Sequence, residues 1–482
     1  MSNYFISIGG SGAKTMEALV HLAAAGLMPN DGDLYTLAID PDVGNGNLNR
    51  SCGVMKKYIS FQQLHTGATE LFKTKMELAD PWRPTQDAKQ TLDKLMDYQL
   101  YKDTPVASLY KALYTEKERQ TDLDKGFRGH PSIGSAVMAK SIDIEGDSFG
   151  EGPWNSFRQH VEAEATRGEQ VRIFLAGSVF GGTGAAGMPT IAKLLQKMFE
   201  TDHDEGKVMI GGVLVLPYFS FDPKPDDIRP GEMYASSKNF PTNTQAALRY
   251  YSMENKGGAL YDTMYFVGDT HQTAVRKFSL GSADQKNDAH IVDMYAALAA
   301  LDFYGTEKKN LRKYAYILHE EDRFTWPDIP VNEEKFAQYI RFILAYLHIV
   351  KPVLDLVPEG KASDWKYPWF RDFHLENANC NTVPEVRDFN DYAEGFVTWL
   401  LQIGMQPARR VDLIQPQVMG YDEYGNIAVN PDRFVNFDGT DSNVSIDEIW
   451  WRISEGCGYD ADAGGFGAFL RSLYDACAKE VK

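Results

Sequence analysis

The sequence is poor in cysteine and has no long apolar run. Its four cysteines lie far apart and lack the spacing of a metal site, which is typical of reduced thiols in a cytoplasm: Cys52, Cys380, Cys457 and Cys477. No stretch of about 18 or more apolar residues is present, and the N-terminal MSNYFISIGG has no basic region before its apolar part. We therefore expect a soluble, cytoplasmic protein without a membrane span.

The chain also has fewer basic than acidic residues. The chain carries 49 Lys and Arg against 67 Asp and Glu, a net charge of −18. Because nucleic-acid backbones are bound by lysine and arginine, this deficit argues against a nucleic-acid partner. One bound nucleotide remains compatible with it, since helix N-termini and loop amides can hold an anion locally. The length of 482 residues and a hydrophobic content of 43% predict an ordinary globular protein of two or three domains.

The most informative stretch is 171–195, VRIFLAGSVFGGTGAAGMPTIAKLL. An apolar strand, 171–176, leads into a loop of small residues, 177–187, and then into a helix. Such a loop can cradle phosphates, because glycines allow close approach and the amides at a helix start attract anions. The donors would be the backbone of Gly181, Gly182 and Gly184 with the hydroxyl of Thr183. Glycine loops also serve as tight turns without a ligand, so this motif alone leaves both interpretations open.

A second strand, glycine loop and helix open the chain. The strand 4–8 is followed by Gly9, Gly10, Ser11 and Gly12, and a helix is expected from about residue 13 to 25. The loop is not a Walker A motif, because Ala13 precedes Lys14, and it is not GxGxxG, which counts against an NAD-type Rossmann enzyme. Lys14 is either a solvated lysine at a helix start or a phosphate contact.

Two acidic residues follow the next strand, 34–39. Asp40 and Asp42 come just after its carboxyl end, where ligands lie in open α/β sheets. They could hold a hydrated Mg²⁺ beside a phosphate. The alternative is an Asx/Pro turn around Pro41.

Five motifs in one order resemble those of the tubulin/FtsZ family. GGTGAAG resembles the family's GGTG(S/T)G phosphate loop, and the other four segments are GGSGAK, IDPDVG, RGHPSIG and LPYFSF. IDPDVG is similar to DLEPGT of tubulins, RGHPSIG to RGHYTIG, and LPYFSF to the strand-end loop that passes the ribose. Together they cover about the first 300 residues and identify the chain as resembling a divergent, prokaryotic tubulin/FtsZ-like GTPase.

The resemblance implies a site for GTP or GDP with Mg²⁺. Gly10, Ser11, Gly12 and Lys14 would lie beside the phosphates together with Gly181, Gly182, Thr183 and Gly184. The metal would be served by Asp40 and Asp42, the γ-phosphate side by Arg128 and Gly129, and the ribose by the loop at Pro217.

The base would be read at the start of a long central helix. Asn287 and Asp288 occupy that place in the resemblance, with Asn243 and Asn255 as further base or ribose candidates. A carboxylate accepts hydrogen bonds from guanine, while an amide both donates and accepts. Asn and Asp are also preferred helix N-caps, so the two roles can coexist. The choice between guanine and adenine stays open.

The expected fold is therefore α/β, a Rossmann-like tubulin/FtsZ GTPase domain with a parallel sheet. We expect the nucleotide-binding domain over 1–285, the central helix over 286–305 and a divergent, mainly helical C-terminal domain over 306–482. In FtsZ a loop after the central helix, NxDxxD, supplies acidic residues to the neighbour's nucleotide. Here that loop is DFYGTEKKNLRKYAY, in which Asp302 and Glu307 are the acidic candidates but have a different spacing.

Two functions follow from this pattern. The first is a GTPase that self-associates head to tail into filaments, with hydrolysis slow in the monomer because no catalytic residue is evident in cis. The second is a non-polymerising protein whose partner reads loops ordered by GTP. The complete pocket favours the first, and the helical C-terminal region favours the second.

Overall fold

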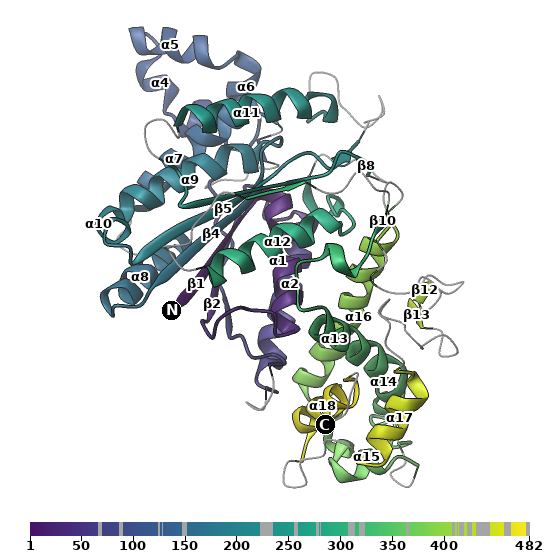
Figure 1. The fold of residues 1–482 in the computed structure, drawn as a ribbon. Helices are drawn as coiled ribbons and strands as arrows, with labels where there is room; N and C mark the ends of the chain where they lie inside the picture. Colours follow the sequence, from purple (N-terminus) through teal and green to yellow (C-terminus); the bar gives the residue numbers. More distant parts are fainter. Residues whose placement is uncertain are drawn as a thin grey trace.

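The fold is that of a computed structural model of residues 1–482 (Figure 1). The structure describes all residues except 66–69, 86–89, 124–125, 128, 147–151, 222–234, 255–258, 276–278, 280, 307–313, 318–322, 363–365, 407–409, 412, 414–418, 422–426, 430–443, 457–463 and 479–482.

A seven-stranded parallel sheet organises the N-terminal part. Its strands, in the spatial order β3-β2-β1-β4-β5-β7-β9, are β3 Met76–Leu78, β2 Leu34–Ile39, β1 Ser2–Ile8, β4 Val171–Ser178, β5 Val208–Val215, β7 Thr263–Gly268 and β9 Tyr314–Ile317. Parallel sheets are buried on both faces, which explains why β1, β2, β4 and β5 are buried almost throughout and rich in apolar residues. The expected α/β class with a parallel sheet is confirmed.

The strand order reverses between β1 and β4. From β1 the chain first builds outward through β2 and β3, and then returns to the other side of β1 with β4 and the strands beyond it. Ile8, at the end of β1, pairs with Ile39 of β2 and with Gly177 of β4. The carboxyl ends of these three strands are therefore level, and such a switch point is where open α/β sheets bind ligands.

Helices cover both faces of the sheet. One face packs against α1 Gly9–Ala24, α2 Gly46–Gln62 and α12 Ile291–Gly305, and the other against α7 Pro131–Gly146, α8 Pro153–Thr166 and α9 Thr183–Met198. Side chains of β1 alternate accordingly, with Phe5 in the first core and Tyr4 and Ile6 in the second. The other helices of this part are α3 Leu92–Leu95, α4 Tyr98–Tyr101, α5 Pro105–Leu113, α6 Glu116–Gln120, α10 Glu200–Asp204 and α11 Phe240–Glu254.

The central helix α12 is buried on all sides. Its start differs from the expectation, because it begins at Ile291, four residues after Asn287. His290 is the N-cap: its side chain accepts from the Val292 amide, and Asp293 accepts from the His290 amide in return. Asn287 and Asp288 thus do not cap the helix and lie in the segment that leads to it.

The C-terminal part is mainly helical, as expected. Its helices are α13 Glu333–Ala345, α14 Lys351–Leu354, α15 Pro368–Asp372, α16 Pro384–Gly404, α17 Ile446–Ser454 and α18 Phe466–Ala476, and a π-helical turn, Tyr346–Val350, joins α13 to α14. Three short strand pairs complete the fold: β6 Phe219–Ser220 with β8 Thr273–Ala274, β10 Arg323–Phe324 with β11 Arg410–Val411, and β12 Met419–Tyr421 with β13 Ile427–Val429. No helix in the described ranges is both long and apolar enough to cross a membrane.

The helices α16 and α2 join the two parts of the chain. They pack along one another, and the rings of Phe61 on α2 and Phe389 on α16 lie 5.2 Å apart. The apolar core on this face of the sheet therefore continues into the C-terminal helices. The expected domain boundaries at 285 and 305 remain predictions.

Candidate functional site

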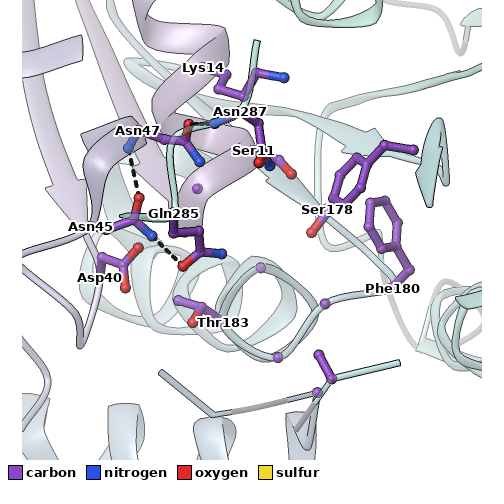
Figure 2. Close-up of a pocket in the computed structure, with 18 of the residues that line it drawn as sticks. Ser11, Lys14, Asp40, Asn45, Asn47, Ser178, Phe180, Thr183, Gln285 and Asn287 are labelled. Atoms are coloured by element: carbon purple, nitrogen blue, oxygen red, sulfur yellow. Dashed lines mark hydrogen bonds between the residues drawn. The ribbon is translucent and has the colours of Figure 1, made fainter. Parts of the chain in front are cut away.

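A cavity of about 170 Å³ lies at the carboxyl end of the sheet, at the switch point. Segments that follow β1, β2, β4 and β5 line it, together with the segment before α12 (Figure 2). The segments after β1, β2, β4 and β5 meet here because these strands are parallel and in register, and residues from further loops, such as Gly129, complete the lining.

The two glycine turns meet at this cavity. Gly9, with φ +70°, starts α1 directly after β1, and a Cβ there would lie 3.2 Å from the Cβ of Thr183. Gly182 is more tightly confined, because a Cβ on it would lie 2.8 Å from the backbone nitrogen of Gly129, in a third loop at the cavity. Glycine at these two positions therefore allows the three loops to approach one another closely.

Both helices that begin at this cavity, α1 and α9, have uncapped N-termini. The N-termini of α1 and α9 carry, among the described residues, no capping side chain and no acidic residue in the first turn. The first amides of a helix have no partner within it, and the helix dipole adds a partial positive charge. Two such ends converging on one cavity form a site for a multiply charged anion.

Asp40 and Asp42 form the acidic side of the cavity. Both are buried, and Oδ1 of Asp40 accepts from the Asp42 amide at 3.0 Å. Asp42 accepts from the amides of Gly44, at 3.1 Å, and of Ser282. The Asx-turn interpretation thus holds for both residues. Burial raises the pKa of Asp40 to about 7, and the neighbouring Asp42 charge adds to this.

The acidic side fits Mg²⁺ as a one-carboxylate site. Mg²⁺ is commonly held by one or two carboxylates, with water and substrate phosphates completing its shell. Oδ1 of Asp40 serves the turn, which leaves its second oxygen for a cation, whereas Asp42 uses both oxygens on backbone amides. No group of three or more metal-binding side chains occurs in the described part of the chain, which is compatible with a metal that relies on phosphate oxygens.

Four amide side chains form another wall of the cavity. Asn45 is the N-cap of α2, and its Nδ2 donates to Oε1 of Gln285 at 2.9 Å. Oδ1 of Asn47 accepts from the backbone amide of Asn287 at 2.8 Å (Figure 2). Amides both donate and accept, which suits the polar edge of a purine base. Of this wall only Asn287 was predicted. The NGN sequence after Asp42 was the available signal for Asn45 and Asn47.

Lys14 is buried in an ion pair. Its Nζ lies 2.8 Å from Oδ2 of Asp293 and 3.2 Å from the hydroxyl of Tyr218, which itself donates to Asp293 at 2.8 Å. Burial and the Asp293 charge raise the pKa of Tyr218 well above its usual range. The solvated-lysine interpretation is therefore wrong. Sequence reasoning missed Asp293, which stands 279 positions from its partner.

Aromatic rings line the side of the cavity next to the second glycine turn. Phe180 lies against Phe240 and Phe219, with ring centroids 4.5 and 5.5 Å apart. The sequence did not predict this side, because its rings come from three segments that are far apart in the chain.

Most predicted site residues meet at the cavity. Those that line it are Gly10, Ser11, Lys14, Asp40, Asp42, Gly129, Gly181, Gly182, Thr183, Gly184 and Asn287. Gly12 faces the sheet, where a Cβ would lie 2.4 Å from the Ala176 carbonyl oxygen. Asn243 donates to the Phe180 carbonyl at 3.1 Å, just behind the lining. Pro217 and Asp288 adjoin the lining residues Tyr218 and Asn287.

Of the two candidates for hydrolysis, the structure describes only Asp302, which does not line this cavity. Asp302 is near the opposite end of α12, where its Oδ2 accepts from the Tyr265 hydroxyl at 2.6 Å and it lines a separate cavity with Lys335. Glu307, Arg128 and Asn255 lie outside the described residues.

Comparison with known proteins adds a family match. Residues 5–248, about half of the 482-residue chain, match the model of a family described as tubulin-like. No curated protein matches the chain.

Several solved structures are also similar. CetZ from Methanosaeta thermophila is 14% identical, covering 62% of this chain and 52% of its own, with a TM-score of 0.26. CetZ2 from Haloferax volcanii, a GTPgS-bound protofilament, is 15% identical, covering 63% and 59%, with a TM-score of 0.28. A TubZ-Bt two-stranded filament is 12% identical, covering 56% and 46%, with a TM-score of 0.24. The chain thus spans about half the length of the solved proteins it matches.

Proposed function

Because the chain belongs to the tubulin-like family, we propose that it binds GTP and GDP at the switch-point cavity and hydrolyses GTP during head-to-tail self-assembly in the cytoplasm. The observation that carries the proposal is the convergence of the uncapped N-termini of α1 and α9 on one cavity. The strand register places the two glycine turns side by side, and two uncapped helix ends at one cavity are suited to binding a chain of phosphates.

Backbone amides would carry most of the phosphate binding. Lys14 is already neutralised by Asp293, and the chain as a whole is strongly acidic. The amides of Gly10 and Ser11 on one side and of the turn 181–184 on the other would therefore hold the phosphates, with the Thr183 hydroxyl as a further donor. This arrangement attracts an anion without requiring a basic surface.

Asp40 would hold Mg²⁺ beside the phosphates. A magnesium ion bound there would neutralise charge on the β- and γ-phosphate oxygens. Asp42 would act on the same site by holding the turn, since its carboxylate accepts from the Gly44 and Ser282 amides.

The amide wall would read a guanine base. Guanine presents two donors and a carbonyl acceptor on one edge, and Asn45, Asn47 and Gln285 offer both kinds of partner. Adenine lacks the carbonyl, so we propose that the cavity prefers guanine.

Hydrolysis would depend on a second copy. Asp302, near the far end of α12, is too distant from the cavity to act within one chain, so a neighbour stacked head to tail would have to bring acidic residues to it. We therefore expect slow turnover in the monomer and faster turnover on assembly.

Two measurements test the proposal. The first is mass analysis of the nucleotide released from the purified chain, with and without Mg²⁺, where GTP or GDP is expected and NAD or no nucleotide would refute it. The second is light scattering with GTP or GDP, where a rise with GTP alone is expected. Flat traces at high concentration would refute filament assembly while leaving nucleotide binding intact.

A nucleotide-gated interaction protein is the second candidate. It is favoured by the packing of α2, whose N-terminus borders the cavity, against α16 of the helical C-terminal part. Nucleotide-dependent shifts of α2 would then reach a partner bound to these helices. Pull-downs with a GTP analogue or GDP would decide, since identical partner sets would count against it.

A further inference from the structure

The helix α5 presents an apolar stripe to solvent. Val106, Leu109 and Leu113 are 59%, 62% and 63% exposed, and Leu100 on the preceding helix α4 is 84% exposed. Of the twelve large hydrophobic residues exposed in the described part of the chain, these four fall within fourteen positions. The three on α5 have the spacing i, i+3 and i+7, which places them on one face of the helix. Concentrated exposure of this kind marks an interaction surface.

The side of α5 opposite this stripe packs against α4 and α6. The other face of α5 buries Ala107 and Tyr110, and the Tyr110 ring lies 5.5 Å from that of Tyr98 on α4. The guanidinium of Arg119 lies 5.0 Å above the Tyr98 ring and pairs with Asp93 at 3.1 Å. The stripe is therefore exposed on a packed support. Figure 1 shows α4 and α5 projecting at the edge of the molecule, away from the C-terminal helices.

We propose that α5 is a self-association surface, on which a second copy of this chain docks antiparallel through its own α5. The first argument is charge. The whole chain carries −18, so two copies repel each other over most of their surfaces. From Asp97, the N-cap of α4, to Gln120, the end of α6, the chain has four acidic and four basic residues. One of the basic residues, Arg119, is buried and pairs with Asp93, so the remaining charges of this face sum to −1 and two copies repel each other only weakly here.

The second argument is charge complementarity across a twofold axis at Leu109. Lys102 stands seven residues before Leu109 and Glu116 seven after it, and both are exposed. Antiparallel docking brings Lys102 of one copy to the end that carries Glu116 of the other, with Asp103 and Lys117 beside them. Parallel docking would instead set like charges opposite each other. Antiparallel helix dipoles add to the preference.

Sedimentation equilibrium of the full chain without added nucleotide tests this inference. We expect a concentration-dependent dimer in the micromolar range, as a small interface allows. The double variant Leu109→Asp/Leu113→Asp should weaken dimerisation at least about tenfold. The matched control Met253→Asp, which replaces a 70% exposed side chain on α11, should leave it unchanged.

A charge swap separates self-docking from any other occupant. Lys102→Glu should weaken the dimer, and Lys102→Glu/Glu116→Lys should restore it. Leu109→Cys should also give a disulfide-linked dimer under mild oxidation, beyond any that the wild-type chain forms. A chain that stays monomeric, or a dimer unaffected by the leucine variants or by the swap, would overturn the inference.

This test is independent of the proposed function. A chain that dimerises through Leu109 without binding GTP would leave the inference standing, and a chain that binds GTP as a monomer would refute the inference alone.

Discussion

Nζ of Lys14 lies 2.8 Å from Oδ2 of Asp293, and the two side chains are only 4% and 2% exposed. The pair joins the second turn of α1, at the cavity, to the first turn of the central helix α12. Asp293 also accepts from the His290 amide in the capping box and from the Tyr218 hydroxyl. The carboxylate of Asp293 thus links Lys14 and Tyr218, which line the cavity, to the start of α12.

Removing one partner of this pair should be costly. Lys14→Met leaves the Asp293 charge buried without its counter-ion, so we expect the free energy of unfolding to fall by about 3–5 kcal/mol. Lys14→Met/Asp293→Asn removes the charge as well and should recover much of that loss, while keeping an acceptor for the His290 amide. Urea unfolding of the single and double variants measures the coupling. Additive losses in this cycle would show that the pair does not act as a unit.

Gly12 should be required for packing. A Cβ there would lie 2.4 Å from the Ala176 carbonyl oxygen on β4 and 3.0 Å from the Ser7 carbonyl carbon on β1. Both are backbone atoms that cannot yield locally, so Gly12→Ala should cost about 1–3 kcal/mol or more in urea unfolding. Gly53→Ala is the matched control on α2, where the space is open, and should gain up to about 1 kcal/mol. Equal effects of the two substitutions would contradict the close packing of α1 on the sheet.

His21 should make the protein sensitive to acid. Its ring is fully buried, its Nδ1 lies 3.2 Å from the Tyr392 hydroxyl, and its Nε2 has no hydrogen-bond partner among the described residues. Burial lowers the pKa of His21 from 6.5 to about 3, with the Arg50 charge adding to this. The unfolded chain therefore binds more protons below pH 6.5, and stability is lost as the pH falls from there toward 3.

The size of this effect is measurable. Between pH 7 and pH 5 the group should contribute a loss of about 2 kcal/mol, which His21→Gln should remove. Urea unfolding at several pH values checks this difference in slope. Parallel pH profiles for the two proteins would show that His21 is not the group responsible.

Asp40 should make nucleotide binding depend on magnesium. Asp40→Asn keeps the acceptor for the Asp42 amide but removes the charge that would hold the cation. We expect the affinity for GTP in the presence of Mg²⁺ to fall at least about tenfold, because the attraction between the Asp40 carboxylate and the magnesium ion is lost. Addition of EDTA should weaken binding to the wild type and leave the variant unchanged. Asp31→Asn, at an exposed ion pair with Lys73, is the control. Retention of a full Mg²⁺ effect in Asp40→Asn would exclude this carboxylate as a ligand.

The sequence predicted the parts of the site that rest on local patterns. Strands β1, β2 and β4 are rich in apolar residues because both faces of a parallel sheet are buried, and the turns after β1 and β4 demand glycine. Each of these patterns lies within a few residues, so each can be recognised without the fold. The placement of Gly10 and Gly182 at one cavity followed from the family resemblance and agrees with the strand register.

The rest depends on distant pairs or on weak signals. Lys14 with Asp293 and Asn45 with Gln285 are pairs that only the folded sheet brings together. The edge strand β3 has only three residues, too few to show an alternating pattern. The helix α9 begins at Thr183, inside the segment that the sequence predicted as a loop. Gly184 and Gly187, whose small size suggested a loop, instead let the first turns of α9 pack closely against β4 and β1.

Isothermal titration of the purified chain with GTP in Mg²⁺ tests the central claim most directly. The account predicts one GTP per chain with micromolar or tighter affinity, at least about tenfold weaker binding of ATP, and a similar loss in Gly182→Ala, whose Cβ would lie 2.8 Å from the Gly129 amide. Gly53→Ala should bind as the wild type does. Absence of binding by any purine nucleotide, or unchanged affinity in Gly182→Ala, would contradict a phosphate site between the two glycine turns.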